Sequence, residues 1–288
     1  MLKNTGHEEM QGIAVILGLE EIHFIEPSFA MLPDTRFTAL LEECEGTQAR
    51  LLIDENSDPL CMAVCNGDDT WIAGCFHLRK PTATLISRFE YLGGDIFQEE
   101  RDIWESAVRG YYSRELATHT SPALEDLNPV RISLVDSLIG EILGNGSGQS
   151  CLDCGCGSGV GSLLLRKRGY STLSCDNDPS LISLGFAKGR LVFEETMLID
   201  ASLLHHYTGH CDTGLGLMFG EIHDFNEGMW EQITGELIML TDRSLITTGT
   251  EQEAMRIRNW AHQYGADAEV SENLRDPIYD RWICSISH

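Results

Sequence analysis

The sequence predicts an α/β protein in which a doubly wound, mostly parallel sheet fills the C-terminal part and a smaller α+β region precedes it. Strand-like and helix-like segments alternate from residue 149 onward, a pattern typical of a parallel sheet covered by helices on both faces. Short strand-like runs separated by turns fill residues 38–80. The length of 288 residues is enough for one large core or two modest ones.

We expect the first domain to span residues 1–125 and to begin with a small antiparallel meander. The runs ARLLI, LCMAV and TWIAGCFHL are typical of strands, and the turn-rich pieces DENSDP and CNGDD separate them. Apolar residues at three- and four-residue spacings then predict a helix from Gln98 to about His119. We expect this region to cap the carboxyl edge of the following sheet and to contribute substrate contacts.

We expect the second domain to span residues 126–288. Its first helix follows Pro129 and ends at the glycine-rich stretch 144–148. The predicted strands are SCLDC, TLSCD, TMLID, GLGLMF, SLITTGT and RWICSIS, and a predicted helix lies between each successive pair except before GLGLMF. In such sheets ligands bind at the carboxyl ends of the strands, near the point where strand order reverses.

Composition and charge disfavour some classes of binding partner. A net charge of −25 repels a phosphate backbone, which disfavours nucleic acid as a partner. No apolar run approaches the roughly 20 residues that span a bilayer, and the start MLKNTGHEEM does not resemble a signal peptide. We therefore expect a cytoplasmic protein without a membrane partner, whose ten cysteines are reduced thiols.

A glycine-rich loop, DCGCGSGVG, lies directly between a predicted strand and a predicted helix. Glycine allows a sharp turn and lets a ligand approach bare backbone. A phosphate-binding P-loop is excluded because no lysine follows these glycines until Lys167. The dinucleotide fingerprint requires a third glycine where Val160 or Ser162 stands, so neither of its two frames fits.

The loop resembles the first motif of class I S-adenosylmethionine-dependent methyltransferases, an acidic residue followed by three alternating glycines. Asp153, Gly155, Gly157 and Gly159 supply all four positions. The resemblance covers about residues 129–288, and it implies a Rossmann-like fold with a seven-stranded sheet. It also implies that the backbone near Gly155 and Gly157 contacts the methionine and ribose portions of the methyl donor. Asp153 would orient the loop and the donor's amino group.

An acidic residue ends the next predicted strand, where a carboxylate can accept hydrogen bonds from both ribose hydroxyls. Asp176 and Asn177 stand there and resemble the second motif of the family. Asp178, which follows, is better explained as a charge at the start of a helix. The third strand ends in Asp200 and Ala201, similar to the family's adenine-binding pair, although Asp200 also suits a turn cap.

Residues 219–225, which follow the fourth predicted strand, resemble the reaction-site loop of small-molecule methyltransferases and lack the Asn/Asp-Pro-Pro-aromatic motif of many amide and base methylases. His223 is the first candidate for a general base because an unperturbed pKa of about 6.5 suits proton removal near neutrality, and Glu221 is the second. Either residue is equally well explained as a polar side chain at a strand end.

Two further features lie before the glycine loop. Tyr111, with Tyr112, resembles the aromatic-containing helix that relatives fold over the cofactor, so it is a candidate contact of the methionine carboxylate, and core packing explains at least one of the pair. Cys61, Cys65, Cys75 and His77 do not have the spacing of paired metal-binding knuckles, nor do the cysteines of the glycine loop, so we expect no metal site.

The resemblance implies methyl transfer from S-adenosyl-L-methionine, with S-adenosyl-L-homocysteine as product, to a small-molecule or protein side-chain acceptor. Its main alternative is a regulatory or interaction protein that binds the same cofactor without turnover. A nicotinamide-dependent oxidoreductase is a third interpretation, which the incomplete dinucleotide fingerprint disfavours.

Overall fold

A computed structural model describes residues 12–66, 68–125 and 127–288. Its chain divides into two compact units, Met1–Tyr112 and Ser113–His288. The start MLKNTGHEEM, used above to argue against a signal peptide, lies outside the described residues. None of the helices within the described ranges is long and apolar enough to cross a membrane.

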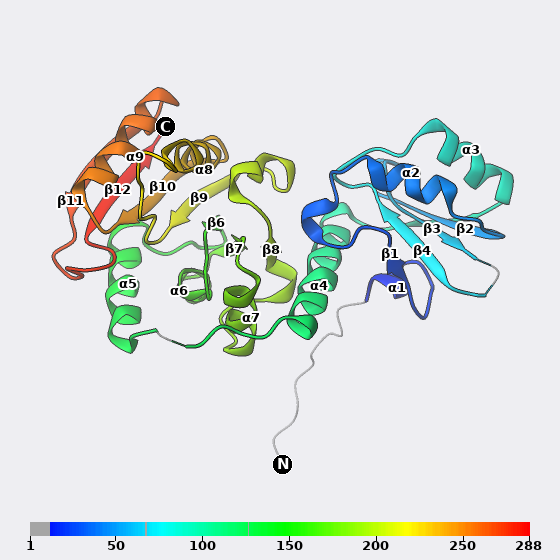
Figure 1. The fold of residues 1–288 in the computed structure, drawn as a ribbon, viewed down its shortest axis with the longest axis horizontal. Coiled ribbons are helices and arrows are strands. Elements are labelled where there is room, and N and C mark those ends of the chain that lie inside the picture. The colour runs from blue at the N-terminus through cyan, green and yellow to red at the C-terminus, as the bar shows by residue number, and fades with distance from the viewer. Residues whose placement is uncertain (1–11, 67, 126) are drawn as a thin grey trace, which may run out of the picture. The chain divides into compact units, whose positions relative to one another are not determined.

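The N-terminal unit contains a five-stranded sheet in the order β1-β4-β3-β2-β5 (Figure 1). The predicted meander is confirmed, since β3 pairs antiparallel with both β2 and β4, and two short parallel strands, β1 and β5, extend it. Leu41, Met62, Val64 and Phe89 contribute to its core. The strands are β1 (His23–Phe24), β2 (Gln48–Ile53), β3 (Pro59–Cys65), β4 (Trp71–Cys75) and β5 (Asp95–Gln98); the helices are α1 (Ile13–Ile16), α2 (Arg36–Glu43) and α3 (Ala83–Leu92), with a 3₁₀ turn at Phe29–Met31.

The C-terminal unit contains a seven-stranded sheet in the order β11-β12-β10-β9-β6-β7-β8. Neighbouring strands from β10 to β8 run parallel, and β12 is antiparallel to β10 and to β11. The predicted fold class, a doubly wound and mostly parallel seven-stranded sheet, is therefore confirmed. Its strands are β6 (Ser150–Cys154), β7 (Ser171–Asp176), β8 (Thr196–Leu198), β9 (Cys211–Gly216), β10 (Thr241–Thr248), β11 (Asp267–Glu272) and β12 (Trp282–Ser287).

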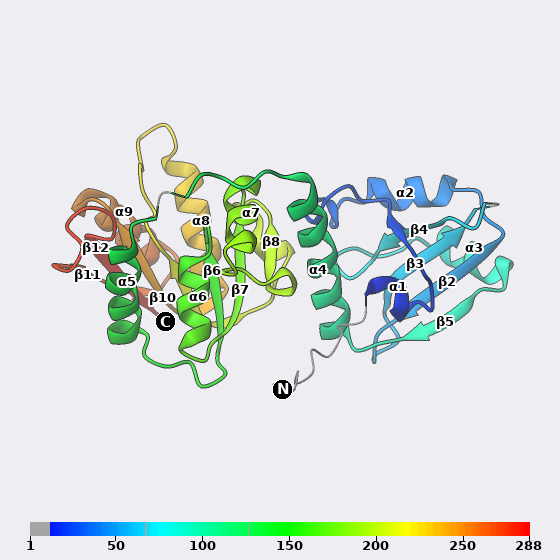
Figure 2. The same ribbon diagram turned by 90° about the horizontal axis from the view of Figure 1, so that it is seen from below.

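Helices cover both faces of this sheet (Figures 1 and 2). Helices α5 and α6 pack onto β6, β9, β10 and β12 through a core that includes Val135, Leu138, Leu164, Leu215 and Leu245. Their partners across the sheet, α8 and α9, pack on each other and on β10. The helices are α5 (Pro129–Ile142), α6 (Val160–Lys167), α7 (Pro179–Ala187), α8 (Glu227–Met239) and α9 (Glu251–Gln263), with 3₁₀ segments at Phe193–Glu195 and Ala201–His206.

The boundary between the units falls inside α4 (Arg101–His119), earlier than the boundary at residue 125 expected from the sequence. The segment that follows is attached to the C-terminal unit. Ser113 Oγ donates to the Thr196 carbonyl at 3.1 Å, and the Ala123 N–H donates to the Ser180 carbonyl at 3.0 Å. These hydrogen bonds explain why residues 113–125 belong with the second sheet.

The strand order reverses at β6. From β6 the chain goes outward through β7 to β8, and it then returns to the other side of β6 to form β9 and β10. The carboxyl ends of β6, β7 and β9 therefore meet at one edge of the sheet, which is where open α/β sheets bind their ligands.

Candidate functional site

The loop between β6 and α6 requires glycine at three alternating positions. Gly155, Gly157 and Gly159 have φ values of +67°, +52° and +80°. This left-handed region costs other L-residues roughly 1–2 kcal/mol each. The alternating glycines are therefore a backbone requirement of this loop.

Two close approaches at the start of α6 also require glycine. A Cβ atom at Gly159 would lie 2.6 Å from Leu191 Cγ. One at Gly161 would lie 2.8 Å from Asp153 Oδ2, so Gly161 lets α6 pack directly against the end of β6. No sequence motif considered above requires a glycine at position 161.

Asp153, the penultimate residue of β6, carries a buried carboxyl group and is only 1% exposed. Its Oδ2 accepts a hydrogen bond of 2.5 Å from Ser162 Oγ, which also lies 2.8 Å from Ser174 Oγ. Burial raises the pKa of Asp153 to about 6, against the opposing effect of the Ser162 hydrogen bonds. Asp153 is therefore positioned to hold the loop and to change charge in the mildly acidic range.

Asp176 connects the end of β7 to the glycine loop. One oxygen, Oδ2, accepts from the Gly157 N–H at 2.8 Å, and the other accepts from the Asp178 N–H at 2.8 Å. Burial raises the pKa of this carboxyl group. A carboxylate has about four acceptor positions, so Asp176 retains capacity for ligand hydroxyls. Asp178 caps α7 by accepting from the Ser180 and Leu181 N–H groups, as expected for a charge at a helix start.

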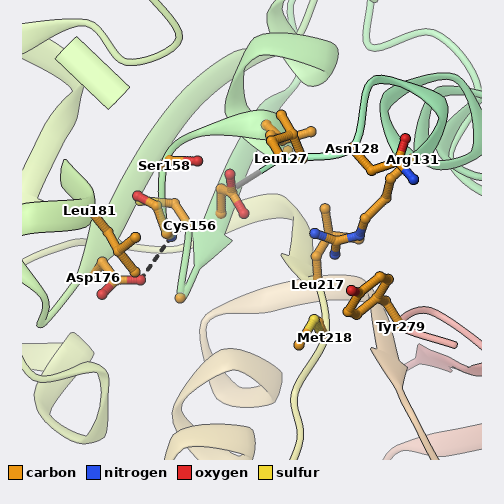
Figure 3. A pocket seen from close by; sticks show the side chains of 15 residues that line it. Leu127, Asn128, Arg131, Cys156, Ser158, Asp176, Leu181, Leu217, Met218 and Tyr279 are labelled. Carbon is orange, nitrogen blue, oxygen red and sulfur yellow. Dashed lines mark hydrogen bonds between the residues drawn. The ribbon is translucent and has the colours of Figure 1, made fainter. Parts of the chain in front are cut away.

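Two adjoining cavities open at this edge of the sheet. The first, the glycine-loop cavity, has a volume of about 390 Å³ and is lined by Asp153, Gly155, Gly157 and twelve other residues (Figure 3). The second, the Asp200 cavity, has a volume of about 320 Å³. Both volumes are in the range of small-molecule sites. The residues that line both cavities are Gly155, Asp176, Leu217 and Met218.

The Asp200 cavity is lined by five of the sequence-predicted residues: Asn177, Asp200 and Ala201, together with Gly155 and Asp176, which it shares with the glycine-loop cavity. Asp200 Oδ1 accepts from the Ser202 N–H at 2.9 Å, so it does cap the turn after β8. Apolar side chains form the remaining wall, and Phe219 lies with its ring centroid 5.0 Å from that of Trp230. An apolar wall can pack against a flat ring, and a carboxylate beside that wall can accept a hydrogen bond from an amino group on the ring.

The candidate general bases lie on the loop between β9 and α8. This loop is braced by Asn226, whose Oδ1 accepts from the His223 N–H at 2.7 Å and whose Nδ2 donates to the Glu221 carbonyl at 2.9 Å. Both candidate side chains are exposed, and Glu221 has a φ of +56°. Within the described residues, Met218 and Phe219 of the adjoining segment line the cavities, whereas Glu221 and His223 do not.

Tyr111 belongs to the N-terminal unit, where its ring packs edge-on against Phe24 and Tyr112, each at 5.1 Å between centroids. The hydroxyl of Tyr112 donates to the Glu26 carbonyl at 3.1 Å. Aromatic packing thus accounts for both tyrosines within their own unit, and a cofactor contact by Tyr111 stays a prediction.

The cysteines of the N-terminal unit are part of its core. Cys61 and Cys75 lie opposite each other on β3 and β4, and the Cys75 thiol lies 2.8 Å from His77 Nδ1. Burial raises the pKa of Cys75 far above its usual range and lowers that of His77 to about 3, so both groups are neutral. In the part of the chain that the structure describes, no three His, Cys, Asp or Glu side chains converge as metal ligands.

Arg131 and Tyr279 also line the glycine-loop cavity, and the sequence analysis did not identify either (Figure 3). Arg131 lies near the start of α5, and Tyr279 lies between β11 and β12. No local motif marks them, because their proximity depends on how α5 packs against a loop far along the chain.

No family model matches this chain, and no curated protein matches it. Among solved structures, magnesium protoporphyrin IX methyltransferase from Synechocystis PCC 6803, with bound S-adenosylmethionine, is 18% identical; the match covers 66% of this chain and 99% of that one, with a TM-score of 0.45. A ribosomal protein L11 methylase from Lactobacillus delbrueckii subsp. bulgaricus is 14% identical over 58% of this chain and 81% of that one, with a TM-score of 0.43.

The sheet order, the antiparallel β12 and the glycine loop after β6 are features of the chain itself. They coincide with the architecture that the sequence motifs imply. The C-terminal unit of this chain therefore has a Rossmann-like fold with a doubly wound, mostly parallel seven-stranded sheet.

Proposed function

We propose that the C-terminal unit binds S-adenosyl-L-methionine and transfers its methyl group to a small-molecule or protein side-chain acceptor. One observation carries the proposal. The backbone of Gly155 and Gly157, in left-handed conformations, lines a cavity at the switch point of the sheet, and Asp176 from the adjacent strand accepts a hydrogen bond from the Gly157 N–H.

The two cavities suit the two ends of such a donor. In our proposal the amino-acid and ribose portions occupy the glycine-loop cavity, where Asp153 faces an ammonium group and Asp176 accepts from ribose hydroxyls. Adenine occupies the Asp200 cavity, with the free oxygen of Asp200 accepting from the exocyclic amine. Ala201 and Asn177 form the adjoining backbone wall.

Methyl transfer from a sulfonium depends more on how the reactants are positioned than on acid–base groups. A sulfonium methyl group is transferred by in-line displacement: the carbon–sulfur bond breaks, a bond to the acceptor nucleophile forms, and the sulfur leaves as a neutral thioether. Holding the two reactants in near-attack geometry can lower the barrier by roughly 7–11 kcal/mol. The fixed loop and the braced Asp176 supply such a rigid frame on the protein side.

An acceptor that must lose a proton also needs a base. We propose His223 first and Glu221 second, because their loop continues directly from Met218 and Phe219, which line the cavities. The net charge of −25 supports an acceptor other than nucleic acid.

The direct test is formation of S-adenosylhomocysteine from S-adenosylmethionine in the presence of a panel of small molecules and peptides. Product that accumulates only with both an acceptor and the intact protein supports the proposal. Binding of S-adenosylhomocysteine without turnover across the whole panel would favour the alternative of a regulatory protein, and absence of binding would contradict both.

A further inference from the structure

Arg131 presents a fixed guanidinium group to the glycine-loop cavity. Its Nε donates to Asp280 Oδ2 at 3.0 Å, and its guanidinium carbon lies 5.3 Å from the ring centroid of Tyr279. Figure 3 shows the side chain extending from its helix toward Leu217, with the Tyr279 ring beside it. The arginine side chain is 19% exposed, so it is held in place yet still reachable.

The partner that holds Arg131 is itself anchored. Asp280 is 1% exposed, and its Oδ1 accepts from Thr247 Oγ1 at 2.6 Å at the end of β10. Its carbonyl accepts from Asn273 Nδ2 at 2.8 Å. Asp280 therefore fixes the Nε edge of the guanidinium group. Because the group is planar and rigid, the direction of its terminal nitrogens, Nη1 and Nη2, is fixed as well.

The opposite edge of the guanidinium group has unused donors. Arginine carries five N–H donors, four of them on Nη1 and Nη2. Within the described residues, neither terminal nitrogen of Arg131 has a hydrogen-bond acceptor in the protein. Leu127, Leu217 and Met218 line the cavity beside it, and Arg131 is the one basic side chain among the described lining residues.

We propose that Arg131 binds a carboxylate group inside the glycine-loop cavity. Two parallel N–H donors match the two oxygens of a carboxylate, which makes such pairs shorter and stronger than neutral hydrogen bonds. The carboxylate comes either from the amino-acid end of the methyl donor or from an acidic acceptor bound next to it. The inference rests on the proposed function and names the chemistry that this wall of the cavity recognises.

The experiment uses trifluoroacetate, a carboxylate that ¹⁹F NMR detects, with the full-length protein. One sample is saturated with 5′-methylthioadenosine, which has the nucleoside and thioether but no amino-acid group. The other is saturated with S-adenosylhomocysteine. If Arg131 binds the donor's carboxylate, trifluoroacetate binds in the first sample and is displaced in the second. If Arg131 binds an acceptor's carboxylate, trifluoroacetate binds in both samples.

The variants then assign the effect to Arg131. In Arg131→Gln we expect trifluoroacetate affinity to fall at least about tenfold in every sample where the wild type binds it, as for loss of a charged hydrogen bond. If Arg131 binds the carboxylate of the methyl donor, the affinity of this variant for S-adenosylhomocysteine falls similarly, whereas its affinity for 5′-methylthioadenosine stays within about twofold of the wild type. Arg281→Gln, which removes an exposed guanidinium group paired with Glu272, is the matched control and leaves all affinities unchanged.

A second variant distinguishes a loss of binding caused by misfolding from a loss caused by the missing guanidinium donors. Arg131→Lys keeps a positive charge beside Asp280 but lacks the two-pronged donor, so we expect native melting behaviour with an intermediate loss of affinity. Wild-type binding of S-adenosylhomocysteine that Arg131→Gln and Arg131→Lys both retain, with trifluoroacetate unaffected, would overturn this inference alone. A wild type that binds trifluoroacetate through Arg131 but neither nucleoside would overturn the proposed function and leave this inference standing.

Discussion

Asp176 accepts a hydrogen bond from the Gly157 main-chain N–H at 2.8 Å, so the acid at the end of β7 also fixes the loop that follows β6. This contact joins the two sequence motifs into one structural unit. A ligand that engages Asp176 therefore meets a loop whose position is already determined. The hydrogen bond between Asp176 and Gly157, together with the two adjacent cavities, leads to testable predictions.

Replacing Asp176 with Asn should weaken donor binding more than it weakens the fold. An amide offers one acceptor oxygen and an NH₂ group, so it cannot serve the Gly157 N–H, the Asp178 N–H and ribose hydroxyls together. We expect affinity for S-adenosylhomocysteine to fall at least about tenfold, and stability by about 1 kcal/mol. Calorimetric titration and urea denaturation measure the two effects.

The control is Asp178→Asn. Asparagine is as good a helix N-cap as aspartate, so this variant should keep the cap on α7 and bind the ligand within about twofold of the wild type. Equal losses in the two variants would show that the effect is general and that Asp176 has no special contact.

Replacing Gly157 with Ala tests the backbone requirement of the loop. Its φ of +52° should cost alanine roughly 1–2 kcal/mol of stability. The new methyl group would also project from the surface that we assign to the ligand, so donor affinity should fall too. Gly144→Ala is the matched control, because Gly144 has a φ of +75°, has open space around it and lies outside both cavities.

Both glycine variants should therefore lose comparable stability, and only Gly157→Ala should lose ligand binding. Thermal denaturation with and without S-adenosylhomocysteine separates the effects, since at a fixed ligand concentration a tighter ligand raises the melting temperature more. A ligand-induced shift of wild-type size in Gly157→Ala would remove Gly157 from the binding surface.

Donor affinity should decrease as pH falls through about 6. Asp153 is ionised above a pKa of about 6 and neutral below it, and only the ionised form attracts the donor's ammonium group. Protonation therefore removes an attraction, and binding of the ammonium group should lower the pKa of Asp153 in return. Titrations with S-adenosylhomocysteine between pH 5 and 8 measure the slope of affinity against pH.

The variant Asp153→Asn should bind more weakly at neutral pH and lose the slope around pH 6. 5′-Methylthioadenosine has no ammonium group, so its affinity should change little over this interval in the wild type. A pH slope of equal size for both ligands would assign the titration to another group, such as Asp176, whose pKa is also raised by burial.

Asp200→Asn should reverse a preference for the purine base. The Asn oxygen can still cap Ser202, but its NH₂ group replaces the oxygen that we assign to the exocyclic amine of adenine. S-Inosylhomocysteine carries an oxygen acceptor at that position. We expect the variant to lose affinity for S-adenosylhomocysteine and to gain relative affinity for the inosine analogue, and competition titrations give the ratio. An unchanged ratio would leave Asp200 as a cap alone.

His223→Ala and Glu221→Ala should leave donor binding within about twofold, because neither side chain lines the cavities. If one of them is the general base, its variant should lower kcat by on the order of 10²–10⁴-fold with a protonated acceptor. The pH dependence of kcat should change with it. Full turnover in both variants with the true acceptor would exclude a base at either position.

The fold of the C-terminal unit was predictable because its signals are local. Parallel strands such as β6 are buried on both faces and appear as apolar runs, and the left-handed turns select glycine at Gly155, Gly157 and Gly159. Strand β11 (Asp267–Glu272) was missed because it is a polar, largely exposed edge strand. Strands β1 and β5 were missed because they are only two and four residues long.

The site was predictable to the extent that it follows chain order. Asp153, Asp176 and Asp200 each lie at or next to the carboxyl end of a parallel strand, so the sheet itself brings them to one edge. Arg131 could not be identified this way, because its partner Asp280 is 149 residues away in sequence. The loop position of Glu221 and His223 follows from the sequence, but the direction of their side chains depends on bracing by Asn226.

Calorimetric titration of the full-length protein with S-adenosylhomocysteine tests the methyl-donor site most directly. We expect saturable binding of one molecule per chain, weakened in Gly157→Ala and Asp176→Asn and retained in Gly144→Ala. Absence of binding to the wild type, or equal binding to all four proteins, would contradict the assignment of a methyl-donor site to the glycine loop.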